Sequence, residues 1–177
     1  MKLFNLFQNR KIRYVNIICV CVLLTAAITA VRSDIYHEYV PIVVSRSVLE
    51  SSVSFEGARV LENPGKIYVW ENYLFVNEKY LGVHVLDNTD PSNPENVGFL
   101  KIPGNIDIAI KDGYLYADNA VDLITLDIEE IAQGSVQVTD RQKEVFPDLV
   151  NPDGYIPWSY EKGNRPEGTI IIGWKYK

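Results

Sequence analysis

An imperfect tandem repeat in the middle of the chain constrains its fold more than any other feature. The first copy covers residues 64–102 and the second covers residues 103–146. Within the copies, Tyr73-Leu74-Phe75 matches Tyr114-Leu115-Tyr116 at an offset of 41. A fixed period near forty residues, with several short strands in each copy, is typical of β-propeller blades.

Each copy contains four segments with strand character. The links Glu71-Asn72 and Asp112-Gly113 suit tight hairpins, because Asn and Gly tolerate positive φ. The segment 128–134 is predicted to form one helical turn that ends at Gly134. We therefore predict an all-β fold, a partial β-propeller of two four-stranded antiparallel blades with a lead-in and a tail. The expected strands are Lys66–Trp70, Tyr73–Asn77, Gly82–Asp87, Val97–Ile102, Asn105–Ile110, Tyr114–Asp118, Val121–Asp127 and Ser135–Glu144.

The segments that flank the repeats have weaker patterns. In the lead-in, residues 34–63, Tyr39–Val44 is expected to form an edge strand, because Pro41 cannot donate to a ladder. Ser47 is expected to cap a short helical segment, with Glu50 three residues later. The tail, residues 147–177, is expected to be irregular with one strand, Thr169–Trp174. Four repeat residues are expected to be buried: Leu74, Val85, Leu115 and Leu126.

Residues 1–33 have the pattern of a targeting segment. Basic residues, among them Lys2 and Arg10, precede an apolar stretch from Val15 to Val31 that is long enough, at the lower limit, to span a bilayer. Cleavage after Ser33 makes the segment a signal peptide, and retention makes it a membrane anchor. Both alternatives predict export of the remainder to the periplasm, outer membrane or cell surface.

Charge and cysteine usage exclude several classes of function for the exported part. Both cysteines, Cys19 and Cys21, lie in the apolar stretch, so the remainder holds neither a disulfide framework nor a thiolate zinc site. Residues 34–177 contain 12 basic and 23 acidic residues, a net charge of −11. This balance argues against binding to nucleic acid.

Several segments of the repeats resemble a known family, the LVIVD-repeat β-propeller proteins, which are exported or surface proteins of Gram-negative bacteria. The resemblance implies a protein of the cell envelope without enzymatic activity, and many such proteins are tethered as lipoproteins. This chain departs from the family in lacking a lipobox and in ending where relatives continue into more blades, which predicts C-terminal truncation. The segments that carry the resemblance, over residues 41–174, are 62–68, 73–78, 82–88, 90–94, 102–107 and 115–118.

Acidic residues give two candidate sites, each with a structural alternative. Asp87, Asp90 and Asn93, with Glu95 nearby, could offer oxygen ligands to calcium. The spacing lacks an EF-hand loop, however, and the prolines between them favour a rigid turn closed by Asx-turns at Asp90 and Asn93. In the second repeat, paired carboxylates could hydrolyse glycosides. We favour structural or surface roles for these aspartates, which are Asp107, Asp118 and Asp122.

Histidines and aromatic residues give weaker signals. His37 and His84 are 47 residues apart and make a poor metal set. Three tryptophans, Trp70, Trp158 and Trp174, could line a carbohydrate or protein contact surface. We favour packing between blades for the aromatic strand residues, which are Tyr68, Tyr73, Phe75, Tyr114 and Tyr116.

The sequence therefore predicts an exported, non-enzymatic binding or scaffold protein of the cell envelope, without a cofactor, a metal or a catalytic residue. Its expected partners are proteins or carbohydrates, with membrane contact only through residues 1–33. The alternative is an extracytoplasmic hydrolase or lyase that acts on polysaccharide through the aspartates of the second repeat. Two blades leave edges and faces exposed, so we also expect self-association, in which Ile170-Ile171-Ile172 could pair across an edge.

Overall fold

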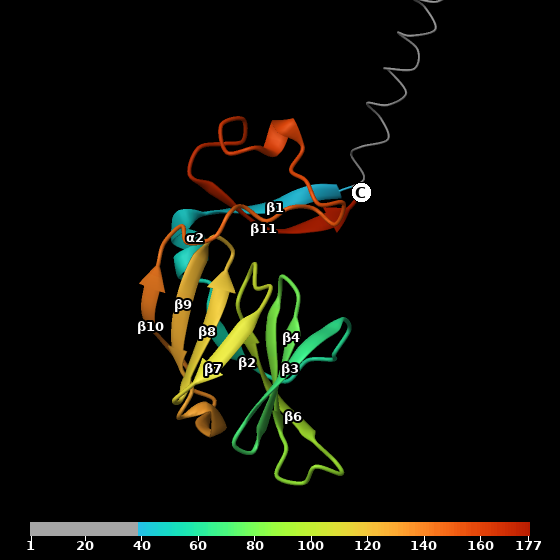
Figure 1. Cartoon of the computed structure of the whole chain (residues 1–177), viewed down its shortest axis with the longest axis vertical. Helices are drawn as coiled ribbons and strands as arrows, with labels where there is room; N and C mark the ends of the chain where they lie inside the picture. Colours follow the sequence, from blue (N-terminus) through green and yellow to red (C-terminus); the bar gives the residue numbers. More distant parts are fainter. Residues whose placement is uncertain (1–38) are drawn as a thin grey trace, which may run out of the picture. The chain divides into compact units, whose positions relative to one another are not determined.

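Three antiparallel sheets make up residues 39–177, the part of the chain that the structure describes (Figure 1). In this computed structural model the first repeat lies in a five-stranded sheet, the second forms a four-stranded sheet, and the two ends of residues 39–177 pair in a third. The predicted all-β class is confirmed. The proposed targeting segment and His37 lie outside the described residues. Within residues 39–177, no helix is long and apolar enough to cross a membrane.

Each repeat folds as a meander in which consecutive strands pair. The hairpin links have the expected positive φ, at Glu71 (51°) rather than Asn72 in the first repeat and at Asp112 (51°) and Gly113 (77°) in the second. The strands are β3 (Pro64–Trp70), β4 (Tyr73–Glu78), β5 (Gly82–Asp87) and β6 (Glu95–Lys101) in the first meander, and β7 (Ile108–Lys111), β8 (Tyr114–Asn119), β9 (Asp122–Asp127) and β10 (Gln137–Gln142) in the second.

The first sheet contains a strand that the sequence analysis missed. β2 (Ser54–Glu56) comes from the lead-in and pairs with β6, so that Phe55 lies opposite Leu100. The Phe55 ring occupies the space in which a Cβ at Gly98 would lie. Glycine at position 98 therefore allows the lead-in to pack closely on the repeat.

The main hydrophobic core lies between the two meanders, with buried residues from both. Strand residues alternate between the two faces of a sheet. Phe75 and Val85 of the first sheet and Leu115 and Leu126 of the second face this core and are completely buried. The prediction for Leu74 is wrong, because it points to the opposite face of the first sheet and is only half-buried.

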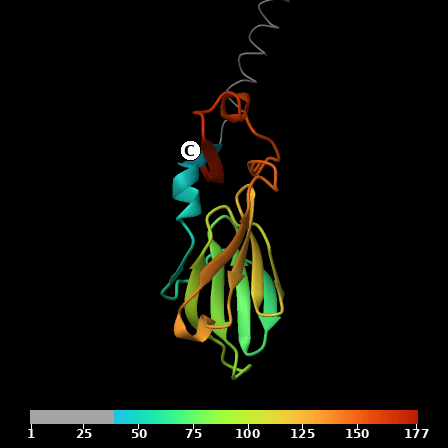
Figure 2. The same cartoon turned by 90° about the vertical axis from the view of Figure 1, so that its left-hand side faces the viewer.

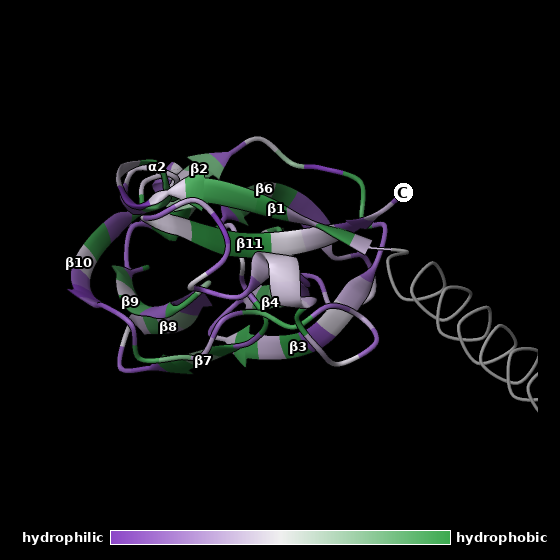
Figure 3. Cartoon of the chain, turned by 90° about the horizontal axis from the view of Figure 1, so that it is seen from above, coloured by the Kyte–Doolittle hydropathy of each residue, from purple (hydrophilic) through white to green (hydrophobic). Residues whose placement is uncertain are grey.

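The third sheet lies beyond one end of the meanders (Figures 1 and 2). It pairs β1 (Tyr39–Ser45), the strand expected in the lead-in, with β11 (Thr169–Tyr176). Viewed from above, the two strands lie side by side and carry hydrophobic segments (Figure 3). Ile170 and Ile171 therefore pair with Val44 and Val43 of the same chain, and Ile172 lies at the register shift between them and Gly173.

Short helical segments complete the structure. The helix α2 (Arg46–Glu50) is capped by Ser45, whose hydroxyl accepts from the Val48 N–H, and not by Ser47 as predicted. The predicted helical turn of the second repeat is the 3-10 helix η1 (Ile131–Gln133), which ends at Gly134 with φ 69°. The tail is irregular as expected, apart from η2 (Trp158–Tyr160) and β11.

Candidate functional site

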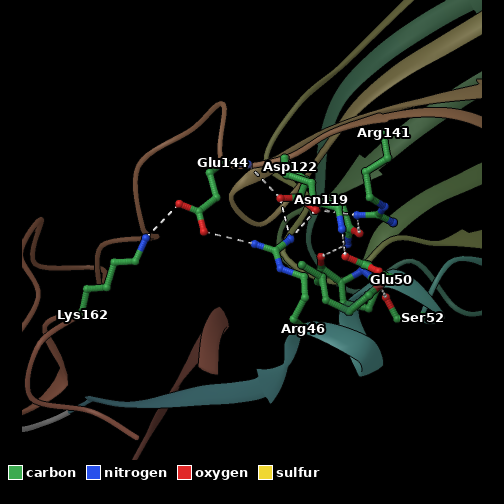
Figure 4. A network of polar contacts seen from close by, with 11 residues as sticks. Arg46, Glu50, Ser52, Asn119, Asp122, Arg141, Glu144 and Lys162 are labelled. Carbon is green, nitrogen blue, oxygen red and sulfur yellow. Dashed lines mark hydrogen bonds and ion pairs between the residues drawn. The ribbon is translucent and has the colours of Figure 1, made fainter. Parts of the chain in front are cut away.

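Asp122 at the start of β9 is the centre of a buried ionic network (Figure 4). Its side chain is completely buried. The Nη1 of Arg46 in α2 lies 2.8 and 2.6 Å from its two oxygens, and the Nη1 of Arg141 in β10 lies 2.8 Å from Oδ2. The backbone N–H of Glu144 donates to Oδ1 at 3.1 Å. The network therefore joins the lead-in to two strands of the second repeat.

Hydrogen bonds determine the charge state of Asp122. Burial alone would raise the pKa of this carboxyl, but donation from Arg46, the Glu144 N–H and Arg141 outweighs it and lowers the pKa below its ordinary value. The Nη2 of Arg46 also lies 3.6 Å from Oε1 of Glu144. The other carboxylate oxygen of Glu144 lies 2.9 Å from the Lys162 ammonium of the tail. These contacts join α2, the second repeat and the tail, which is the arrangement of a structural junction.

Asp118 at the end of β8 holds the loop that links the repeats. It accepts from the backbone N–H groups of Ile106 and Asp107, both at about 3 Å, and from the Asn105 side-chain amide at 2.9 Å. Asp107 in turn accepts from the Tyr68 hydroxyl at 2.7 Å and pairs with Lys66, both on β3. These bonds tie the second repeat to the first.

The two neighbouring acids have opposite pKa shifts. Burial raises the pKa of Asp118 above its ordinary value. Burial also opposes ionisation of Asp107, but hydrogen bonds from Lys66 and Tyr68 lower its pKa. Both residues line a shallow groove of about 270 Å³ that also includes Tyr116 and Phe146. A pair of carboxyls with divergent pKa values is the pattern that acid–base catalysis uses.

A second cleft combines apolar walls with positive charge. It has a volume of about 380 Å³ and lies between the β1–β11 sheet and the turn that joins β4 to β5. Among the described residues that line it, the charged ones are all basic. Its lining comprises Ile42, Arg59, Lys79, Tyr80, Leu81, Lys101, Pro103, Ile172, Gly173 and Trp174.

The cations of this cleft are incompletely neutralised. Arg59 and Lys101 share one carboxylate, that of Glu56. The ammonium of Lys79 lies 4.9 Å from the centre of the Tyr80 ring. Among residues 39–177, one carboxylate therefore faces three positive charges, so two of these charges lack an acid of their own.

Tyr80 in this cleft has an unusual backbone conformation. Its φ of 69° lies in the left-handed region, which a bulky residue adopts only under tertiary constraint. The backbone bonds Tyr80 N–H to Asn105 C=O (2.6 Å) and Gly104 N–H to Tyr80 C=O (2.9 Å) hold it there. The equivalent turn of the second repeat has Ala120 at φ 58°. The conformation of the turn therefore does not require a tyrosine. The role of the Tyr80 ring must lie in its contacts within the cleft.

The acidic turn between β5 and β6 has the Asx-turn predicted at Asp90 and a second one at Asp87 that was not predicted, and it differs from the prediction at Asn93. Asp87 and Asp90 each accept from the backbone N–H two residues later, at 2.8 and 3.0 Å, which closes an Asx-turn. Asn93 instead donates its backbone N–H to the Asp90 C=O. In residues 39–177 no group of three or more His, Cys, Asp or Glu side chains could hold a metal ion.

His84 on β5 is completely buried and faces Glu78 on β4. Its Nε2 lies 2.6 Å from a Glu78 oxygen, and its ring packs edge-on against Phe99. Its Nδ1 has no hydrogen-bond partner among the described residues. Burial opposes ionisation of Glu78, but the bonds from His84 and from the Asn63 N–H lower its pKa. The buried pair links β4 to β5 on the face of the sheet opposite the main core.

The aromatic residues divide between the core and the surface. Tyr68, Tyr73 and Phe75 pack against the main core as predicted, and so does Trp70. Tyr114 and Tyr116 lie on the opposite face of the second sheet, and Tyr114 is exposed. Trp158 is exposed on η2, whereas Trp174 is nearly buried and donates its indole N–H to the Leu149 C=O.

No family model, no curated protein and no solved structure matches this chain. The site must therefore be judged from its geometry. Of the second-repeat aspartates, the structure brings Asp107 and Asp118 together at one groove and puts Asp122 in a separate network. Sequence reasoning missed the basic cleft, because Arg59, Lys79 and Lys101 are far apart along the chain and no local pattern joins them.

Proposed function

We propose that the chain is an exported, non-enzymatic binding or scaffold protein of the cell envelope, built as a partial β-propeller and related to the LVIVD-repeat family. The propeller arrangement is supported by the two consecutive four-stranded meanders that pack face to face. Their first strands, β3 and β7, contact one another. Adjacent first strands are expected at the centre of a propeller.

The basic cleft is the observation that carries the binding function. Its apolar walls and uncompensated cations suit an anion, such as a carboxylate or phosphate, that is attached to an apolar or aromatic body. Tyr80, held in a left-handed conformation, presents its ring beside Lys79. We propose that ligands of this class bind between Tyr80 and Trp174.

Calorimetric titration with 2-naphthyl phosphate tests this proposal, with 2-naphthol as the uncharged control. We expect the phosphate to bind more tightly than the alcohol. Lys79→Gln should raise the Kd about tenfold, which corresponds to about 1.4 kcal/mol. The matched control is Lys175→Gln, a change at an exposed lysine of β11 outside the cleft lining. Equal affinities for the two variants would overturn the assignment of the cleft.

The divergent pKa values of Asp107 and Asp118 favour one alternative, a hydrolase or lyase that acts on polysaccharide. Against it, both Asp118 oxygens accept backbone N–H groups of the inter-repeat loop. A panel of polysaccharide and peptide substrates separates the alternatives. Turnover that is lost in Asp118→Asn, but kept in the exposed-site variant Asp140→Asn, would establish an enzyme and refute the binding-only proposal.

A further inference from the structure

The two faces of each meander have different residue patterns. In the first sheet, Phe75 and Val85 are paired across β4 and β5 and face the core, whereas Leu74 and Leu86 are paired on the opposite face. We call this opposite face, which contains Ile67, Val69, Leu74, Val76 and Leu86, the first outer face. The corresponding second outer face is more polar and contains Ala109, Lys111, Tyr114, Tyr116, Asp118, Leu123, Thr125 and Asp127.

The repeat offset relates each outer face to a core face. A shift of 41 residues takes Ile67, Val69 and Leu74 of the first outer face to Ile108, Ile110 and Leu115, which pack in the core. The same shift takes the core residues Tyr73 and Phe75 to Tyr114 and Tyr116 of the second outer face. Each outer face therefore corresponds, by its position in the repeat, to one of the two sheet faces that pack together in the main core.

The first outer face is covered only in part. The segment between β2 and β3 covers this face at β6. There the Arg59 guanidinium lies 4.4 Å from the centre of the Phe99 ring, and the Asn96 amide donates to the Arg59 C=O. Along β3 the face is open, with Ile67 62% and Val69 68% exposed. On the second outer face, Ala109 and Tyr114 are exposed. Apolar side chains on open sheet faces mark interaction surfaces.

We propose that a second copy of this chain covers these faces. The first outer face of one copy packs on the second outer face of the next and so repeats the interface that the chain forms internally. This inference rests on the proposed propeller arrangement. The contact is head to tail, and a rotation that closes gives a ring. Since propellers close with about four to eight blades, the ring contains about two to four copies.

Native mass spectrometry of the full chain in a mild detergent tests the proposal. We expect a single closed oligomer. Val69→Glu should give monomers, because it would bury a carboxylate in an apolar interface. The matched control is Val48→Glu, the same change at a residue that is 51% exposed and belongs to α2 rather than to either meander. Ala109→Glu, on the other outer face, should also give monomers. Thermal melting monitored by circular dichroism verifies that all three variants are folded.

Mixing the two monomeric variants tests the head-to-tail geometry. Val69→Glu retains an intact second outer face and Ala109→Glu retains an intact first outer face, so the mixture should form a one-to-one pair that cannot close. A folded monomer of the unchanged chain, an oligomer that survives both changes, or a mixture that stays monomeric would each overturn the proposal. These results leave the titration of the basic cleft unaffected, so failure of the ring and failure of the binding function are distinguishable.

Discussion

Asp122→Asn should cost more stability than any change at an exposed aspartate, because it removes the charge on which two arginines converge. The variant keeps the size of the side chain but leaves Arg46 and Arg141 without their common carboxylate. Breaking a buried ion pair costs about 3–5 kcal/mol. Arg46 is 28% exposed and Arg141 12% exposed, so water compensates part of the loss. We therefore expect a loss at the lower end, about 3 kcal/mol.

Urea denaturation, followed by tryptophan fluorescence, measures this loss. For a slope of about 2 kcal/mol per molar urea, the midpoint should fall by about 1.5 M. The control is Asp140→Asn on the neighbouring strand, where an exposed carboxylate should contribute less than about 0.5 kcal/mol. If both variants shifted the midpoint equally, the network would not stabilise the fold and the reasoning would be refuted.

The pH dependence gives a second signature of the same network. The pKa of Asp122 is lowered in the folded chain, so its contribution is fully present above the unfolded value of about 3.9 and is lost as the pH falls through the folded value. The stability difference between the unchanged chain and Asp122→Asn should therefore be largest near neutral pH and shrink in acid. A difference that grew on acidification would contradict the assigned direction of the shift.

Three further predictions concern the repeats. In a carbon-detected NMR titration, Asp118 should titrate above about 3.9, so its contribution to stability is lost as the pH rises through the folded pKa. Leu115→Ala should cost about 2–5 kcal/mol in urea denaturation, and Leu74→Ala, at a half-buried site, clearly less. Gly82→Ala should cost more than about 1 kcal/mol, because φ is 143° and the new Cβ would overlap backbone, whereas Gly57→Ala in open space should melt like the unchanged chain.

Local patterns predicted the meanders, and long-range contacts determined most of what was missed. The hairpins of both repeats follow from alternating residues and two-residue links, which act over a few positions. β2 was missed because three residues show no alternation, and its strand character comes from pairing with β6. The side to which Leu74 points depends on which face of the sheet meets the second repeat, and alternation alone leaves that choice open.

The candidate sites likewise divide into features that local patterns predicted and features that depend on long-range contacts. The Asx-turn at Asp90 was predicted, because it closes over two residues, whereas the one at Asp87 was missed. The bond between Arg46 and Asp122 joins positions 76 residues apart. A lone arginine in a polar lead-in and a lone aspartate at a strand start have no local signal that would pair them. Sequence reasoning therefore named Asp122 as a candidate but could not recognise its role in joining the lead-in to the second repeat.

The equivalent turns of the two repeats explain why the cleft and the network lie where they do. Tyr80 and Ala120 occupy equivalent positions in these two turns, both with positive φ. Ala120 shares a small core with Ile170 of β11, and there α2 brings Arg46 to Asp122. At the other turn, a Cβ on Gly173 of β11 would lie 3.3 Å from Tyr80 Cβ. The sheet therefore packs closely at both turns, and at the tyrosine turn its residues Ile172 and Trp174 also line the basic cleft that we propose as the ligand site.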